Sequence, residues 1–224
     1  MAIAAVALSI GLLSCGSNHK STPTAAPTTA KTATTTGKPH AKVAPRPNAP
    51  GPNPTIAGYI QQNGITQTPV HRGDPGAPII DLPTPDGWTG AGPDTPRGAY
   101  YAVVYNGAEA RKYTPSIIAS LSKLTGNVDQ QKILDLAGGE LKNLPGFKPM
   151  GDGSSSTLGG FPAYQSGGTW VQDDQTKMVA QKTVVIPAGD GLYMLQLNAD
   201  CLEDQLDVAV PATLAIDDQT TIKT

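Results

Sequence analysis

A sharp change in composition near residue 54 limits which part of this chain can fold. Between Gly16 and Pro54, 23 of the 39 residues are Thr, Pro or Ala, and Val43 is the only large aliphatic residue. So few apolar side chains cannot offset the entropy lost on ordering a segment, and this composition is therefore typical of disorder. We predict a flexible tether over residues 15–54 and one globular domain over residues 55–224.

The segment before the tether is an apolar run that ends at a cysteine. Residues 2–13 are almost wholly apolar, and the run closes as Leu12-Leu13-Ser14-Cys15. It is too short to span a bilayer, which takes roughly 20 residues, but it suits a signal peptide. We predict a lipoprotein signal over residues 1–14, with diacylglycerol on the thiol of Cys15 and palmitate or another acyl chain on its new amine. The alternatives are an ordinary secretory signal or a buried free cysteine.

Charge and cysteine content restrict the partners of the domain. Five of the 16 Lys and Arg residues and none of the 18 Asp and Glu residues lie in residues 1–54, so residues 55–224 carry 11 basic and 18 acidic residues, a net charge of −7. Nucleic-acid affinity depends on cationic side chains, so nucleic acid is not an expected partner. If Cys15 carries lipid, Cys201 is the only cysteine left, and an intrachain disulfide is impossible.

The spacing of apolar residues predicts alternating helical and extended segments in the domain. Turn residues at Asp173-Asp174 and Gly189-Asp190-Gly191 separate three extended stretches, which favours antiparallel neighbours. Pro211 is expected to kink or divide the last helix. We predict helices over residues 55–63, 115–124, 129–144 and 202–216, and strands over residues 78–82, 98–106, 161–172, 177–186 and 192–198. The expected fold class is α+β, an antiparallel sheet packed between helices.

Several sequence stretches resemble a known family. They read PTIAGYIQQNGI, PIIDLPTPDGW, YYAVVYNGAEA, GGFPAYQSGGTW, TVVIPAGDGLYMLQLNA and DDQTTI. In these stretches the chain is similar to the mycobacterial LpqN/LpqT lipoproteins over residues 54–224. The resemblance implies a Mog1/PsbP-like α/β/α sandwich. It also implies a protein that binds envelope glycolipid or acyl chains and assists their export, with an RND-type lipid transporter as partner.

The residues give little support to catalysis. His71 is the only histidine after residue 54, so a site with several histidine ligands is excluded. His71, Asp74 and a serine of Ser154-Ser155-Ser156 could form a hydrolytic site, but they are better explained as ordinary loop residues. Cys201 is better explained as a small buried apolar residue than as a nucleophile. The Asp173-Asp174 and Asp217-Asp218 pairs suit turns and helix ends better than calcium. We expect no enzyme activity, no cofactor and no metal.

Aromatic residues carry the binding hypothesis. Aromatic rings with polar tips can line a cavity that takes acyl chains and sugar hydroxyls, although for each of them core packing is the simpler explanation. The lipid-binding candidates are Trp88, Tyr101, Tyr105, Trp170 and Tyr193.

Two functions remain open from the sequence. The first is a monomeric, non-catalytic lipid carrier, exported and anchored through Cys15 to the outer face of the cytoplasmic membrane or to the cell envelope. The second is an adaptor that binds no ligand and docks on a transporter or another envelope protein. A cavity of several hundred cubic ångströms with apolar walls favours the carrier, and a solid core favours the adaptor.

Overall fold

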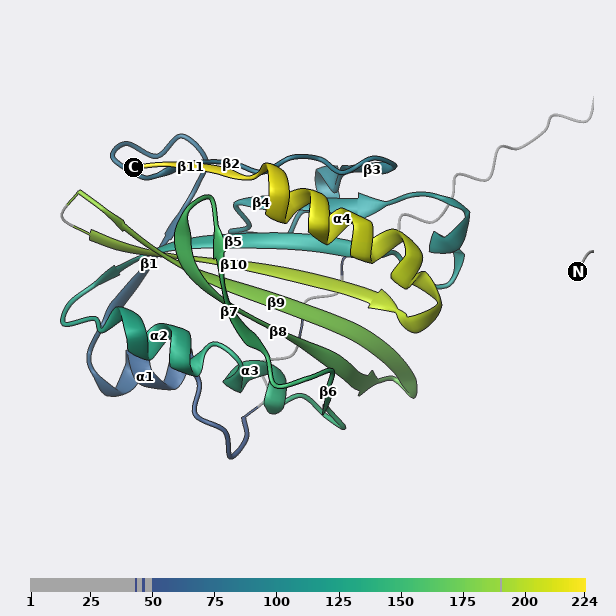
Figure 1. Ribbon diagram of the computed structural model, residues 1–224, viewed down its shortest axis with the longest axis horizontal. Helices are drawn as coiled ribbons and strands as arrows, with labels where there is room; N and C mark the ends of the chain where they lie inside the picture. Colours follow the sequence, from purple (N-terminus) through teal and green to yellow (C-terminus); the bar gives the residue numbers. More distant parts are fainter. Residues whose placement is uncertain (1–42, 44–45, 47–49, 190) are drawn as a thin grey trace, which may run out of the picture. The chain divides into compact units, whose positions relative to one another are not determined.

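The computed structural model of the chain describes Val43, Arg46, residues 50–189 and residues 191–224 (Figure 1). The predicted signal peptide over residues 1–14, the predicted lipidation site at Cys15 and most of the predicted tether lie outside the described residues. Within the described part of the chain, no helix is both long enough and apolar enough to cross a membrane.

An antiparallel sheet is the centre of the described domain (Figure 1). Its strands follow the order β3-β4-β5-β10-β9-β8-β6, while β1 also pairs with β5 and β7 also pairs with β8. The strands are β1 (Thr66–Val70), β3 (Trp88–Gly90), β4 (Tyr101–Tyr105), β5 (Ser116–Thr125), β6 (Lys148–Pro149), β7 (Ser154–Leu158), β8 (Phe161–Gln172), β9 (Gln175–Ala188) and β10 (Gly191–Leu202). The strands β2 (Ile79–Asp81) and β11 (Thr221–Lys223) form a separate two-stranded sheet.

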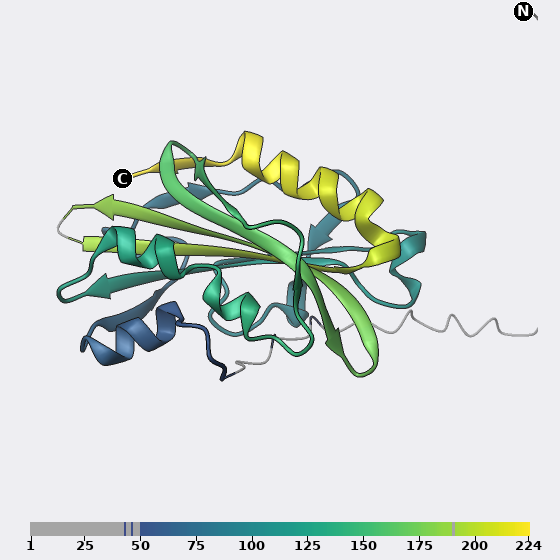
Figure 2. The same cartoon turned by 60° about the horizontal axis from the view of Figure 1, so that its bottom comes forward.

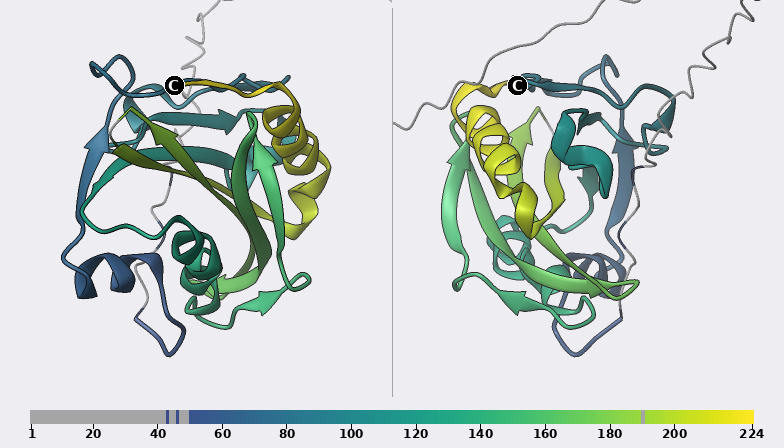
Figure 3. Two further views of the ribbon diagram at one scale, coloured as in Figure 1. Left: turned by 60° about the vertical axis from the view of Figure 1, so that its left-hand side comes forward. Right: turned by 90° about the vertical axis from the view of Figure 1, so that its right-hand side faces the viewer.

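Helices cover both faces of the large sheet (Figures 1 and 2). The helix α4 (Leu206–Gln219) packs on β10 from one side, and α2 (Gln130–Leu136) and α3 (Gly139–Lys142) pack on β8 and β9 from the other. The helix α1 (Ile56–Gln62) lies beside α2 (Figure 3). Short 3-10 turns are η1 (Gly92–Asp94), η2 (Ala108–Arg111) and η3 (Glu203–Gln205). The fold is therefore α+β with helices on both sides of an antiparallel sheet, as predicted.

Alternation along the central strands divides the core into two layers. Val184 and Ile186 of β9 pack in the same cluster as Ile216 of α4, whereas Val185 packs with Ile56 of α1 and Ile133 of α2. Successive strand residues point to opposite faces, so a strand that is apolar at successive positions serves both layers. Below, we call the two sides the α4 face and the α1–α3 face.

Local signals explain the elements that the sequence predicted correctly. The Thr55 side chain accepts a hydrogen bond from the backbone N–H of Gly58 and caps α1, and Gly64 follows the helix with a φ of 62°. Asp173 and Asp174 have φ values of 50° and 58°, the left-handed pair of a two-residue hairpin between β8 and β9. The predicted strand over residues 161–172 has the same bounds as β8.

The helix predicted over residues 115–124 is wrong, because Ser116–Thr125 is strand β5. Ile117, Ala119 and Leu121 face α4, while Leu124 faces α1 and α2. β5 pairs with β1, β4 and β10 and is buried on both faces, so its apolar residues do not alternate with polar ones. A strand of this kind produces apolar spacings that also fit a helix.

Two other helix predictions need correction. The predicted helix over residues 129–144 is divided into α2 and α3 at Gly138 and Gly139. A Cβ at position 139 would overlap the carbonyl oxygen of Pro54, so glycine permits this close approach. Of the two outcomes predicted for Pro211, a kink or a division of the last helix, the division is wrong, because α4 continues through Pro211. Pro211 and Asp207 are both exposed, so water can reach the Asp207 carbonyl that Pro211 leaves without a helical donor.

Candidate functional site

A groove of about 500 Å³ lies between α4 and the sheet on the α4 face. Its walls come from β8, β9 and β10, from α4, and from the loop between β6 and β7. We call it the α4 groove and define it by the lining residues Met150, Ala180, Lys182, Ala199, Thr213, Leu214 and Asp217. Its volume falls in the range of small-molecule sites, roughly 300 to 1,000 Å³.

Small side chains in one row across the sheet form the floor of the groove. Gly167 of β8 pairs with Ala180 of β9, which pairs with Ala199 of β10. A Cβ at position 167 would lie 2.9 Å from the Val179 carbonyl oxygen, so not even alanine fits there without adjustment. Further along the same face, another row has much larger side chains, where Val184 of β9 pairs with Leu195 of β10. The groove exists because side-chain volume is missing under α4 in this one row.

A second recess of about 190 Å³ adjoins the groove. The two share Met150, Gly167, Ala180, Ala199 and Thr213 as lining residues. The second recess reaches under the N-terminal half of α4, and no charged residue lines it. Its inner walls are Met178, Cys201, Leu206 and Ala209, which together form an apolar cluster. The cavity therefore becomes more apolar towards the start of α4.

The entrance carries exposed apolar side chains. Met150 is 63% exposed, Val210 47% and Leu214 55%. Met150 lines both recesses, while Leu214 lines the groove and Val210 the second recess. Gly151 and Gly153 shape the loop next to Met150 with φ values of 90° and 77°. Large apolar side chains gathered around an opening are typical of a binding site rather than of an ordinary surface.

Buried thiol and phenol groups near the sheet are inert at neutral pH. Cys201 is buried at the inner end of the second recess, and burial raises the pKa of its thiol to about 12. Burial also raises the pKa of Tyr101 to about 12. The pKa of Tyr113 is raised as well, by burial and then by the negative charge of Asp200. These groups stay protonated near pH 7, so Cys201 offers no thiolate for catalysis.

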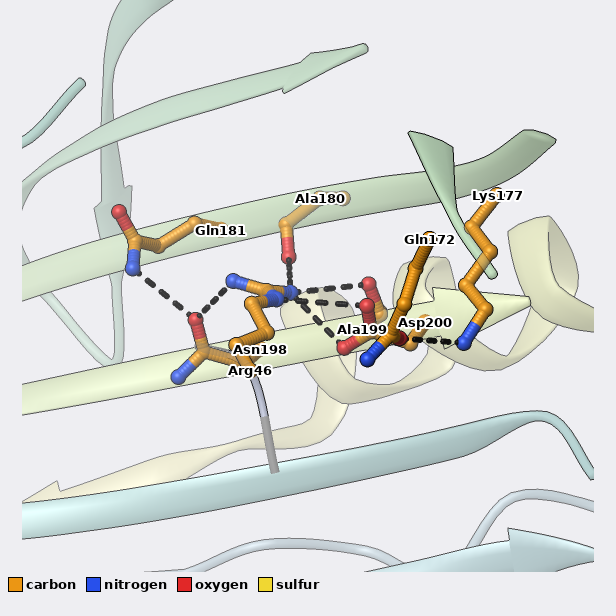
Figure 4. Close-up of polar contacts among 8 residues, drawn as sticks. All are labelled: Arg46, Gln172, Lys177, Ala180, Gln181, Asn198, Ala199 and Asp200. Atoms are coloured by element: carbon orange, nitrogen blue, oxygen red, sulfur yellow. Dashed lines mark hydrogen bonds and ion pairs between the residues drawn. The ribbon is translucent and has the colours of Figure 1, made fainter. Parts of the chain in front are cut away.

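On the α1–α3 face, Arg46 is held by a group of oxygen atoms (Figure 4). Its guanidinium forms an ion pair with Asp200 at 3.0 Å and donates to Asn198 Oδ1 at 2.7 Å. It also donates to the carbonyl oxygens of Ala180 and Ala199, at 3.3 and 3.2 Å. The residue comes from the segment that we predicted as tether, so contacts with the domain begin before residue 55.

Other residues near residue 55 also contact the domain. Val43 packs with Ala91 and Val104. Asn53 and Asn143 pair through their amides, with the Asn53 backbone N–H donating to Asn143 Oδ1 at 3.1 Å and Asn143 Nδ2 donating to the Asn53 carbonyl at 3.0 Å.

The same face holds polar atoms without partners among the described residues. They are Ser166 Oγ, Trp170 Nε1, Gln181 Oε1, Thr183 Oγ1 and Gln196 Nε2, all on β8, β9 or β10. Thr183 is fully buried, and Gln181 is 6% exposed. Buried polar atoms normally find a partner in protein or water, so this face has hydrogen-bonding capacity that the described residues do not use.

The five aromatic candidates lie elsewhere. Trp88, Tyr101, Tyr105 and Tyr193 pack in or against the core cluster of the α4 face, and Trp170 packs with Leu141 and Leu144 on the other face. The Tyr193 hydroxyl donates to the Gly76 carbonyl at 3.1 Å, and the Tyr101 hydroxyl donates to the Pro83 carbonyl at 2.6 Å. None of the five lines the α4 groove or the second recess. In the structure these five residues belong to the core or pack against it, and their contact with lipid stays a prediction.

The alternatives for catalysis and metal binding gain no geometric support. His71 pairs with Asp74, whose carboxylate accepts a hydrogen bond from the His71 backbone N–H at 2.7 Å. Among the described residues, no hydrogen bond or ion pair joins His71 or Asp74 to Ser154-Ser155-Ser156. Asp217 forms an ion pair with Lys182. Among the described residues, no group of three or more His, Cys, Asp or Glu side chains could hold a metal.

The fold is that of a family of bacterial lipoproteins. A family model described as "Probable lipoprotein LpqN" matches residues 52–223, so the chain belongs to the LpqN lipoprotein family.

Among individual proteins, the chain is 49% identical to "Lipoprotein LpqN" of Mycobacterium tuberculosis over 223 residues, which is 99% of this chain and 96% of that protein. It is also similar to a solved structure described as LpqN "involved in cell envelope biogenesis of Mycobacterium tuberculosis". That match has a TM-score of 0.73 and 51% identity, and it covers 78% of this chain and 100% of the other.

Proposed function

We propose that this chain is an exported, membrane-anchored and non-catalytic carrier that holds the acyl chain of an envelope lipid or glycolipid in the α4 groove. The observation that carries the proposal is the groove itself, about 500 Å³ of space with an apolar recess behind it and exposed apolar residues at its mouth. Burial of apolar surface stabilises a bound chain by about 25 cal/mol for each Å² removed from water.

Membership of the LpqN lipoprotein family supports the envelope location. The solved relative is described as involved in cell envelope biogenesis, and a carrier of envelope lipid fits that description. In this proposal Cys15 carries the lipid anchor, and the bound lipid passes to an RND-type transporter. The exposed rim of Met150, Val210 and Leu214 gives a chain a low-energy path between a membrane and the groove.

Filling the groove tests the proposal directly. Ala180 lies in the floor row, lines both recesses and is itself exposed. A phenylalanine there can occupy the space meant for ligand without displacing a core side chain. The matched control is Ala57→Phe, which adds the same ring at an exposed position of α1, away from both recesses.

The assay compares lipid that copurifies with the protein, identified by mass spectrometry, and the affinity for a fluorescent fatty-acyl probe. We expect Ala180→Phe to reduce probe affinity at least tenfold, a free-energy change of about 1.4 kcal/mol, and Ala57→Phe to leave it unchanged. Lipid-free protein that also binds no trehalose mycolate, fatty acid or acyl probe would contradict the carrier and favour the adaptor that docks on an envelope protein.

A further inference from the structure

The acceptors around Arg46 match the shape of a guanidinium group (Figure 4). Arg46 Nε and Nη2 donate to the two carboxylate oxygens of Asp200 at 3.3 and 3.0 Å, and Nη1 donates to Asn198 Oδ1 at 2.7 Å. Nη2 also donates to the carbonyl oxygens of Ala180 and Ala199. All three nitrogens are used, and the single ammonium group of a lysine does not present donors in this planar arrangement.

The sheet holds these acceptors in place. Asn198 and Asp200 are two residues apart on β10, so their side chains leave the sheet on the same face. Gln181 of β9 is in register with Asn198, and its Nε2 donates to Asn198 Oδ1 at 3.0 Å, which fixes the amide oxygen towards the guanidinium. The acceptor site is therefore built by β9 and β10, and Arg46 is its occupant.

Arg46 reaches this site from a distant part of the chain. It lies between 134 and 154 residues from its acceptors, and it and Val43 are the only described residues before residue 50. Val43 contributes a small apolar contact with Ala91 and Val104. Because no strand or helix carries Arg46, it can leave the acceptors and be replaced without rearrangement of the sheet.

The same face has polar atoms beside the guanidinium that remain unpaired. Ser166 of β8 is in register with Gln181 of β9, and in the next row Thr183 of β9 is in register with Gln196 of β10. Ser166 Oγ, Gln181 Oε1, Thr183 Oγ1 and Gln196 Nε2 have no partner among the described residues. Gln181 is 6% exposed and Thr183 is fully buried. An extended peptide carries a donor and an acceptor in each residue, and so can satisfy atoms that a single side chain leaves unpaired.

The charges of the site favour a cation as occupant. Asp200 is 7% exposed, and its ion pair with Arg46 is the one that it forms among the described residues. Lys177, the other cation in Figure 4, instead donates to Gln172 Oε1 at 2.6 Å and lies over the ring of Tyr113. The carboxylate therefore needs a cation from outside the sheet, because a buried charge without a partner is costly.

We propose that Asp200, Asn198 and the carbonyls of Ala180 and Ala199 form a recognition site for an arginine of a partner protein, which Arg46 occupies in cis as an intramolecular competitor. The partner presents its arginine in an extended segment, and the backbone of that segment pairs with the unused atoms of β8, β9 and β10. A competitor in the same chain acts at an effective concentration on the order of millimolar. Only a segment that forms more hydrogen bonds than Arg46 alone therefore displaces it.

The experiment opens the site with Arg46→Ala in the intact chain and measures peptide binding by fluorescence anisotropy. The labelled peptides are the chain's own AKVAPRPNAPG, residues 41–51, and the unrelated Gly-Ser-Arg-Ser-Gly. We expect both to bind Arg46→Ala at least about tenfold more tightly than the natural chain, whose own arginine competes. Lysine in place of the peptide arginine should lower the affinity at least about tenfold.

The carboxylate is tested in the opened protein. Adding Asp200→Asn to Arg46→Ala should abolish the binding of both peptides. Adding Asp207→Asn is the matched control, because it removes the same charge from an exposed residue of α4, and it should leave the affinities unchanged.

A second variant protects the test against a folding failure of Arg46→Ala. Arg46→Lys keeps a cation beside Asp200 but leaves Asn198 without the guanidinium donor, so the arginine peptides should bind it more tightly than they bind the natural chain. Peptide binding should also raise the urea midpoint of either variant, since the folded state alone has the site.

Three results would overturn the proposal. If the chain's own peptide binds the opened site and Gly-Ser-Arg-Ser-Gly does not, Arg46 is a clamp for its own chain and partner recognition is wrong. Equal affinities of the arginine and lysine peptides, or binding that survives Asp200→Asn, would reduce the effect to general attraction by the acidic domain. None of these results bears on acyl-chain binding in the α4 groove, which Ala180→Phe tests separately, so the two proposals fail independently.

Discussion

Replacing Arg46 with alanine should destabilise the domain, although the residue lies in a segment whose composition predicts disorder. Arg46 forms an ion pair with Asp200 at 3.0 Å, and the two side chains are 16% and 8% exposed. Further hydrogen bonds join Arg46 to Asn198, Ala180 and Ala199. The variant leaves the Asp200 carboxylate buried without its cation, and an unpaired buried charge destabilises the folded state more than loss of both partners.

The size of the effect follows from burial. Removing one partner of a fully buried pair costs about 3–5 kcal/mol, and exposed pairs contribute about 0–1 kcal/mol. Arg46 is partly open to water, so we expect a loss of about 2–3 kcal/mol in the free energy of unfolding. Most of this loss comes from the unpaired charge. Adding Asp200→Asn to Arg46→Ala should therefore restore about half of it.

Urea unfolding followed by tryptophan fluorescence measures these free energies, because Trp88 and Trp170 are both buried. The control is Arg97→Ala, which removes an exposed arginine and should change stability by less than about 0.5 kcal/mol. A chain that begins at Thr55 should lose more stability than Arg46→Ala, because it also lacks the contacts of Val43 and Asn53 with the domain. An Arg46→Ala protein within about 0.5 kcal/mol of the natural one would refute the reasoning.

Three further predictions concern the thiols and the buried phenols. Cys15→Ala should abolish labelling by an alkynyl fatty acid and release the protein from the membrane fraction; label that persists on the variant would contradict lipidation at Cys15. Cys201 should resist iodoacetamide at pH 8 in the folded protein and react in urea, because burial raises its pKa to about 12; rapid alkylation of folded protein would be inconsistent with this environment. Burial also raises the pKa of Tyr101 to about 12, so the unfolded chain loses this proton first, near pH 10. The contribution of Tyr101 to the free energy of unfolding is therefore complete below pH 10 and should be lost between pH 10 and pH 12. In urea titrations over this range, a Tyr101→Phe protein should show a smaller loss of stability than the natural protein.

The sequence predicted those parts of the fold that local chemistry determines. Two positive-φ aspartates joined β8 to β9 where a turn was expected, and a threonine cap and a following glycine bounded α1. Strand β5 was missed because tertiary packing buries both of its faces, which removes the alternation that identifies a strand. The division between α2 and α3 falls at Gly138-Gly139, a pair that weakens a helix locally. The close approach of Pro54 to Gly139, 85 residues apart in the chain, could not be predicted from a local pattern.

The candidate site was predicted less well, for a related reason. Aromatic residues were the predicted binding site, but in the domain these residues fill the core. The groove depends instead on the small residues Gly167, Ala180 and Ala199. Each of these is unremarkable in its own strand, and only the register of three strands aligns them under α4. Arg46 gave no signal either, since an arginine among prolines and alanines is an ordinary tether residue until its acceptors on β9 and β10 are known.

Ala180 and Ala199 connect the two features that the sequence did not reveal. Their methyl groups line the groove on the α4 face, while their carbonyl oxygens accept hydrogen bonds from Arg46. A strand residue can do both, because its side chain leaves the sheet on one face while its carbonyl lies near the sheet plane. A larger side chain at position 180 therefore fills the groove and keeps the backbone carbonyl that accepts from Arg46. Replacing Arg46 removes these hydrogen bonds and leaves the space in the groove unchanged. The two variants thus separate ligand binding from folding stability, although both act on the same pair of residues.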